Sequence, residues 1–188
     1  KAAFKGEIEI VGRETAVDPI RGLPVAERWL GAHPGLSMIV GINDGGALGA
    51  HQAVVAAGKD DPDTFFVAGV DGVREALAAI KAGGAYQATV DQPPAMIGRL
   101  VVRSLAATSQ GLPYENHQVI NCTPINRSNV DVFLAAEKPP AFHSELEEDP
   151  LAGLDLHGLR FGLSVQSLAN PFFTALVDGA KEEAARLG

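Results

Sequence analysis

The chain has 188 residues, with 15 Lys and Arg against 23 Asp and Glu, and therefore a formal net charge of −8. Because like charges repel, this acidic balance argues against nucleic acid or an anionic membrane as a partner. The single cysteine, Cys122, excludes an internal disulfide and a multi-cysteine zinc site. Apolar runs such as 65–70 are about a third as long as a membrane-spanning helix, so none is expected.

Short apolar runs bounded by turn residues alternate with segments of helical period. This alternation is typical of βα units wound into a parallel sheet. Each run is too short to be a helix by itself and is bounded by glycine, proline or polar residues. The predicted strands are residues 7–11, 37–42, 65–70, 86–90, 118–122 and 160–165.

Helices are predicted between these strands. Asp18 precedes Pro19, so we expect Asp18 to cap a helix that Pro19 begins and that Pro24 kinks or restarts. A second helix should end at Gly58 in a left-handed cap. The later helices are predicted at about 45–57, at 73–81, from the prolines at 93–94 to the turn at 111–113, and at 171–187.

The composition divides the chain into three parts. Residues 135–158 contain prolines and runs of like charge with little periodicity, which indicates a linker rather than a βα unit. Residues 1–134 before it form the predicted α/β domain. Residues 159–188 after it return to a strand followed by a helix, which we expect to complete the sheet.

Several kinds of catalytic and cofactor site have no counterpart in the sequence. There is no P-loop or dinucleotide-binding glycine pattern, no serine nucleophile elbow, and no histidine pair at the spacing of a helical metal site. Cys122 follows an apolar pair, which favours an inert buried thiol. The sequence therefore predicts no enzyme, no cofactor and no metal.

Polar side chains follow four predicted strands where those strands end. They are Asn43 and Asp44 after 37–42, Asp71 after 65–70, Asp91 and Gln92 after 86–90, and Asn170 after 160–165. The carboxyl ends of parallel strands line one crevice in which ligands bind. Carboxylates and amides there could bind hydroxyl groups. Each of these residues alone, however, is also common in a turn or at a helix N-cap, where it has a purely structural role.

The segments 41–50 (GINDGGALGA), 67–72 (VAGVDG) and 88–94 (ATVDQPP) resemble the C-terminal half of ribose-type periplasmic sugar-binding proteins, which are type I periplasmic binding proteins. Residues 167–173 (SLANPFF) resemble the first strand and helix of that family, which here stand at the end of the chain. This order fits either a fragment of a tandem protein or a permuted and shortened module.

The resemblance implies a flavodoxin-like lobe, with a parallel sheet and helices on both faces. It implies a periplasmic solute-binding protein for a sugar or polyol, which serves the membrane permease of an ABC-type importer or a chemoreceptor and catalyses no reaction. The sugar-contacting positions that it implies are Asn43, Asp71, Gln92, Asn170, Phe172 and Phe173.

Two alternatives share this fold. One is the effector-binding core of a lactose-repressor-type regulator, although no helix-turn-helix is present in the chain. The other is a flavodoxin-like enzyme that uses Asp71 or Asp91 with a histidine.

The segment 160–165 is expected to pair in parallel beside the strands near residues 7 and 37. That pairing would bring Asn170 to the sheet edge together with Asn43 and Asp71. Exchanged between two copies of the chain, the same segment would form a strand-swapped homodimer.

Overall fold

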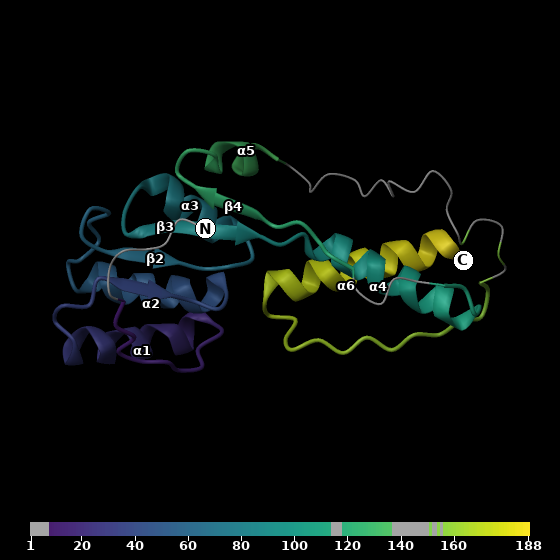
Figure 1. The fold of residues 1–188 in the computed structure, drawn as a ribbon, viewed down its shortest axis with the longest axis horizontal. Helices are drawn as coiled ribbons and strands as arrows, with labels where there is room; N and C mark the ends of the chain where they lie inside the picture. The colour runs from purple at the N-terminus through teal and green to yellow at the C-terminus, as the bar shows by residue number, and fades with distance from the viewer. Residues whose placement is uncertain (1–7, 114–117, 137–150, 152–153, 155) are drawn as a thin grey trace.

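A computed structural model describes residues 8–113, 118–136, 151, 154 and 156–188. Within these residues no helix is both long and apolar enough to cross a membrane. The elements, in chain order (Figure 1), are α1 (Pro19–Ala32), β1 (Met38–Val40), α2 (Asp44–Ala56), β2 (Phe66–Ala68), α3 (Arg74–Ala82), β3 (Tyr86–Asp91), α4 (Pro94–Ser109), β4 (Thr123–Asn126), α5 (Val130–Ala135) and α6 (Pro171–Leu187).

Local signals in the sequence fix the ends of the first helices. The Asp18 side chain accepts a hydrogen bond from the backbone N–H of Arg21 at 2.9 Å and caps α1, as predicted. Gly58 follows α2 with a φ of 67°, which confirms the left-handed cap. Pro24 does not divide α1, which continues to Ala32 and packs against α2. The packing is close, because a Cβ added to Gly22 would overlap the backbone oxygen of Gly46.

The sheet has the order β1-β2-β3-β4. The first three strands are parallel, with Ile39 of β1 opposite Val67 of β2. This confirms the predicted α/β class and the strands at 37–42, 65–70 and 86–90, the last of which extends to Asp91. The strand predicted at 118–122 is wrong. The fourth strand of the sheet, β4, lies at Thr123–Asn126 instead and runs antiparallel to β3. Val119 in the predicted strand is 76% exposed, because 118–122 is the connection along which the chain returns from α4 to the sheet (Figure 1).

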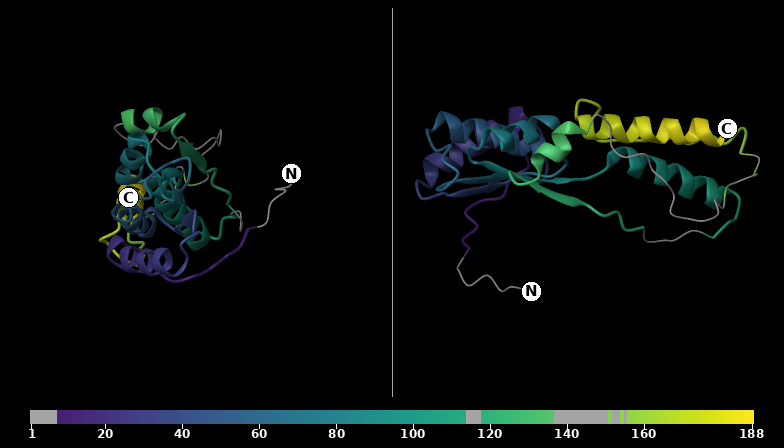
Figure 2. Two further views of the ribbon diagram at one scale, coloured as in Figure 1. Left: turned by 90° about the vertical axis from the view of Figure 1, so that its left-hand side faces the viewer. Right: turned by 90° about the horizontal axis from the view of Figure 1, so that it is seen from above.

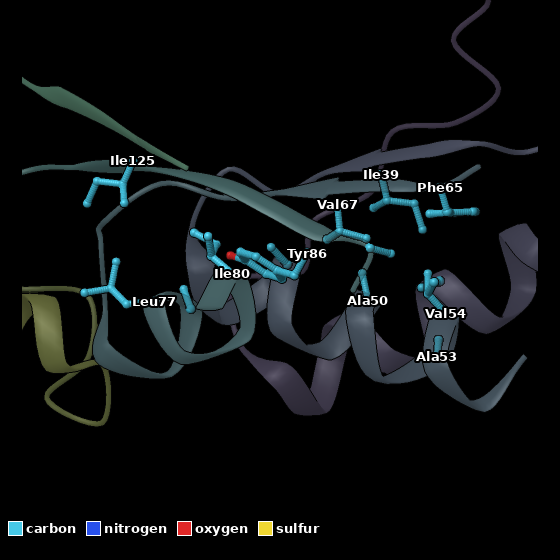
Figure 3. Close-up of a cluster of buried hydrophobic side chains, with 14 of the residues drawn as sticks. Ile39, Ala50, Ala53, Val54, Phe65, Val67, Leu77, Ile80, Tyr86 and Ile125 are labelled. Carbon is cyan, nitrogen blue, oxygen red and sulfur yellow. The ribbon is translucent and has the colours of Figure 1, made fainter. Parts of the chain in front are cut away.

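The core lies on one face of this sheet. Ile39 and Val67 point toward the helices and are almost fully buried with Val54, Ile80 and Tyr86 (Figure 3). Right-handed crossovers between strands in the order β1, β2, β3 put α2 and α3 on the same face. On the other face Met38 and Val40 are 50% and 63% exposed. The prediction of helices on both faces is therefore not borne out by the described residues, whose helices leave this second face uncovered.

The last helix packs against α4, beyond the sheet (Figures 1 and 2). A Cβ added to Gly98 of α4 would overlap the backbone oxygen of Leu176, and one added to Gly179 of α6 would overlap that of Ala95. Glu183 of α6 is buried and accepts from Arg103 of α4 at 2.9 Å. Arg99 pairs with Glu182 and Arg103 with Glu183, and both helices run from the sheet side toward the C-terminus (Figure 1), so α4 and α6 are parallel.

The expected strand at 160–165 is absent, and these residues do not join the sheet. Phe161 and Leu163, two apolar residues of the predicted strand, are 41% and 46% exposed. The physical reason is that α6 is held by α4, away from the β1 edge, and the described residues around this pair offer no strand to accept its backbone hydrogen bonds.

Three further expectations have different outcomes. Residues 8–11 form no strand, and Ile8 and Ile10 are 69% and 61% exposed. Cys122 is exposed, so the buried-thiol prediction is wrong. Most of the predicted linker 135–158 lies outside the described residues, and the division into three parts stays a prediction.

Candidate functional site

The ends of β1, β2 and β3 meet at one edge of the sheet. The backbone N–H of Asp44, just after β1, donates to the Val70 oxygen at 2.6 Å, and that of Asp71 donates to the Val90 oxygen at 2.9 Å. Asp71 and Asp91 also form an isolated parallel bridge. Backbone hydrogen bonds therefore hold together the three segments that carry Asn43, Asp71 and Gln92.

Asp71 and Gln92 are direct partners. The Gln92 side-chain amide donates to Oδ1 of Asp71 at 3.3 Å. Asp71 is half-buried, and its φ of 123° lies in a region that residues other than glycine rarely adopt. Burial and the negative charge of Asp44 raise the pKa of Asp71 to about 7, against the opposing effect of the Gln92 hydrogen bond. The structure thus brings two of the predicted binding residues into contact.

Asn43 has a structural role at the same edge. Its Oδ1 accepts from the Gly46 backbone N–H at 3.0 Å and caps α2, and its Nδ2 donates to the Val17 oxygen at 2.9 Å. A side-chain amide has two donor hydrogens and two acceptor lone pairs. Asn43 therefore keeps one donor and one acceptor site for a further partner.

Asp44, absent from the predicted binding residues, is the most deeply buried polar group of this edge. Its Oδ1 accepts from the Tyr86 hydroxyl at 2.8 Å and the Thr89 hydroxyl at 2.6 Å, and its Oδ2 accepts from the Val73 backbone N–H at 2.9 Å. Burial raises its pKa, and these hydrogen bonds act in the opposite direction. Burial, together with the charge of Asp44, likewise raises the pKa of Tyr86.

No sequence signal predicted this network. Tyr86 and Thr89 are three residues apart, so a regular strand would put them on opposite faces. Both are nevertheless buried, because the pairing of β2 with β3 shifts register between Val67 and Ala68. Asp91, beside Asp71, has its pKa raised by burial. Within the described part of the chain, no group of three or more His, Cys, Asp or Glu side chains is arranged to hold a metal ion.

The remaining predicted site residues lie at the start of α6. Asn170 caps this helix by accepting from the Phe172 backbone N–H at 2.9 Å. The rings of Phe172 and Phe173 meet edge to face with centroids 5.3 Å apart, and both side chains are half-buried. This end of α6 is the one nearer the sheet (Figures 1 and 2). Among the described hydrogen bonds, none joins this group to Asn43, Asp71 or Gln92.

A separate cavity of about 600 Å³ lies at the outer side of β1. It is lined mainly by apolar side chains, including Ile8, Trp29, Met38 and Val40. None of the six predicted binding residues lines it, so it is distinct from the strand-end site.

Comparison with known proteins relates the chain to sugar-binding proteins. The ribose import binding protein of Bacillus subtilis is 37% identical over 99 residues, which are 52% of this chain and 31% of that protein. The D-allose-binding periplasmic protein of Escherichia coli is 40% identical over 99 residues, which are 51% of this chain and 31% of that protein. The chain thus spans about a third of the length of these curated relatives.

A solved structure shares the fold. An ABC transporter solute-binding protein from Bacillus halodurans with bound myo-inositol matches with a TM-score of 0.56 and 31% identity, over 63% of this chain and 40% of that one. A family model described as a periplasmic binding protein domain matches residues 1–113, which are more than half of the 188 residues. This family match, together with the ribose- and allose-binding relatives described above, shows that the chain belongs to the ribose-type periplasmic binding proteins.

Proposed function

We propose that the chain is part of a solute-binding protein that binds a small sugar or polyol and passes it, chemically unchanged, to the membrane permease of an ABC-type importer. The periplasm is the proposed compartment. Two relatives are named for binding ribose and allose, and a related structure contains myo-inositol. These three compounds are uncharged and carry hydroxyl groups on adjacent carbons.

The observation that carries the proposal is the Asp71–Gln92 pair at the ends of neighbouring strands. A carboxylate accepts hydrogen bonds from hydroxyl groups, and an amide both donates and accepts, so the pair is suited to two adjacent hydroxyls of one ligand. The remaining donor and acceptor sites of Asn43 lie at the same edge.

The start of α6 would supply the other side of the site. Phe172 and Phe173 are aromatic and only half-buried, and an aromatic ring packs well against the apolar face of a sugar. Closure of two lobes over the solute by hinge bending is the mechanism proposed for the complete protein.

The two alternatives have less support. The relatives that match are named as sugar-binding proteins, and none of those reported above is a repressor or an enzyme. The enzyme alternative placed a histidine beside Asp71 or Asp91. His51 bonds to Asp60 at 2.9 Å and not to either of these two carboxylates.

The test is a titration of the chain with D-ribose, D-allose and myo-inositol, followed by amide NMR. Saturable shifts should appear at Asp71 and Gln92. Because the chain spans about a third of its relatives' length, weak binding is expected, with dissociation constants above about 1 mM.

Two variants, each with one aspartate replaced by asparagine, test whether the solute binds at the strand ends. Asp71→Asn should weaken binding about tenfold or more, because a charge-assisted hydrogen bond is lost. Asp63→Asn, in the exposed loop before β2, should bind as the parent chain does. Shifts that avoid the strand ends, or equal affinity in both variants, would contradict the proposal.

A further inference from the structure

A buried carboxylate lies next to the proposed solute site. Asp44, the first residue of α2, is fully buried, and no ion pair to it is found among the described residues. Instead it receives hydrogen bonds from two hydroxyls and one backbone N–H. Three donors directed at one carboxyl group match its ionised form, which can only accept.

The hydrogen bonds of Asp44 hold both sides of the loop that carries Asp71. On one side the Val73 N–H donates to Asp44 Oδ2 at 2.9 Å. The Gly72 N–H donates to the Thr89 hydroxyl oxygen at 3.2 Å, and that hydroxyl donates its own proton to Asp44. On the other side the Asp44 N–H donates to the Val70 oxygen at 2.6 Å.

Asp71 lies between these anchors in a conformation that costs free energy. Its φ of 123° is unfavourable for a residue with a Cβ, and such backbone persists only where the surroundings enforce it. Val70 and Val73 are hydrogen-bonded to Asp44 itself, and Gly72 is linked to it through the Thr89 hydroxyl.

We propose that Asp44 is a positioning residue of the solute site: without touching the solute, it holds residues 70–73 so that the Asp71 carboxylate is presented at the edge of the sheet. The inference rests on the proposed function, because Asp71 has a solute to bind only if that function holds. The arrangement of residues 70–73 can nevertheless be measured without any solute.

The charge of Asp44 gives the proposal a second consequence. The titratable groups around Asp71 are Asp44 from the start of α2 and Asp91 and Tyr86 from β3, and no cation among the described residues pairs with it. Burial and then the charge of Asp44 raise the pKa of Asp71. Removing the Asp44 charge should therefore lower the pH at which Asp71 titrates, which a residue that only fills space would not do.

Asp44→Asn is the informative substitution because it keeps the shape and removes the charge. In either orientation of the new amide, at least one buried donor among Tyr86, Thr89 and Val73 loses its acceptor. Hydrogen exchange of the Gly72 and Val73 amides should accelerate about tenfold. The Asp71 midpoint should fall from about 7 toward the ordinary range of a carboxyl group.

Two further variants separate anchoring from charge and from general stability. Tyr86→Phe removes a hydrogen bond to the same Asp44 oxygen but leaves the charge and the loop anchors in place, so both measurements should stay near the parent values. Thr89→Val removes the Gly72 anchor and keeps the charge. It should speed exchange at Gly72 and leave the Asp71 midpoint near 7.

The experiment is a carbon NMR titration of the Asp71 carboxyl group in the full chain, with amide exchange measured on the same samples. The proposal is overturned if Asp44→Asn leaves the midpoint unchanged, or if Tyr86→Phe changes both measurements as much as Asp44→Asn does. If Asp44→Asn fails to fold, unchanged exchange at Gly72 in Thr89→Val overturns it. D-ribose added to the parent chain tests the proposed function separately, through shifts at Gln92.

Discussion

Glu183 of α6 accepts a hydrogen bond from Arg103 of α4 at 2.9 Å although both side chains are almost fully buried, 5% and 10% exposed. Arg186, one turn further along α6, also donates to Glu183 at 2.6 Å. Although burial acts to raise the pKa of Glu183, the hydrogen bonds and charges of Arg186 and Arg103 lower it overall. Two guanidinium groups thus share one carboxylate at the contact between α4 and α6.

Glu183→Ala should therefore destabilise the α4–α6 pair by about 3 kcal/mol, because it removes a buried carboxylate that accepts hydrogen bonds from both Arg103 and Arg186. Urea denaturation followed by amide signals of α4 would measure this loss. Glu182→Ala is the control: its partner bond to Arg99 lies at the surface, and its loss should cost less than about 1 kcal/mol. Equal losses of stability in the two variants would show that the buried ion pairs of Glu183 stabilise the chain no more than the exposed pair of Glu182 and Arg99 does.

The close approach of α4 and α6 gives a second prediction. Gly98→Ala should destabilise the chain by about 2 kcal/mol, since its Cβ meets the Leu176 backbone oxygen and the helices must separate. Gly31→Ala, also within a helix, meets nothing within 4 Å. That control should instead stabilise by about 0.5 to 1 kcal/mol, from the lower entropy of its unfolded chain. Thermal melts of both variants provide the comparison, and a neutral Gly98→Ala would contradict the close packing.

The third prediction concerns pH and Asp71. Because folding raises the pKa of Asp71 from its ordinary value of 3.8 to about 7, the folded state favours the protonated form. Its contribution to stability is complete at low pH and is lost as the pH rises through about 7. Asp71→Asn, which cannot ionise, should therefore be more stable than the parent chain above neutral pH, by on the order of 2 kcal/mol, and similar to it near pH 4.

Denaturation curves at the two pH values measure this difference. The expected result is a gain in stability for the variant that grows as the pH rises. A variant that is less stable at both pH values would mean that the carboxylate is needed for the fold.

The fourth prediction concerns the C-terminal segment. The main core cluster and the side chains packed against it come entirely from residues between Leu23 and Leu134. A chain that ends at residue 149 should therefore keep its sheet and melt cooperatively, although the α4 face that contacts α6 becomes exposed. Circular dichroism and amide NMR of the truncated chain would test this. Loss of the β1–β3 signals would show that 159–188 contributes to the sheet after all.

Local signals explain which elements could be predicted. Asp18 and Asn43 cap helices, Gly58 and Gly83 end them, and β1 to β3 are short apolar runs between such signals. By contrast, 160–165 has the alternation of a strand, but a strand exists only where another strand pairs with it. The short helix α5 carries no cap hydrogen bond from a side chain and is positioned by its packing against α3, so no local pattern marked it.

The candidate site, too, could be predicted only in part. The strand-end positions of Asn43, Asp71 and Gln92 follow from a parallel sheet, and the structure brings Asp71 and Gln92 into hydrogen-bond contact. The connection between Asp44, Tyr86 and Thr89 depends on the register shift between β2 and β3, which periodicity cannot indicate. Whether the six predicted residues bind a solute stays a prediction.

The carboxyl edge of the sheet is also where α2, α3 and α4 begin, at Asp44, Arg74 and Pro94. Helix N-termini carry partial positive charge and ordinarily attract anions. Here the chain's own carboxylates, Asp44, Asp71 and Asp91, already occupy that edge. A phosphorylated sugar would meet these charges rather than the helix ends, so D-ribose 5-phosphate should leave the Gln92 amide unshifted at concentrations where D-ribose moves it. If the proposed function holds, we therefore expect this edge to favour solutes that carry hydroxyl groups and no charge.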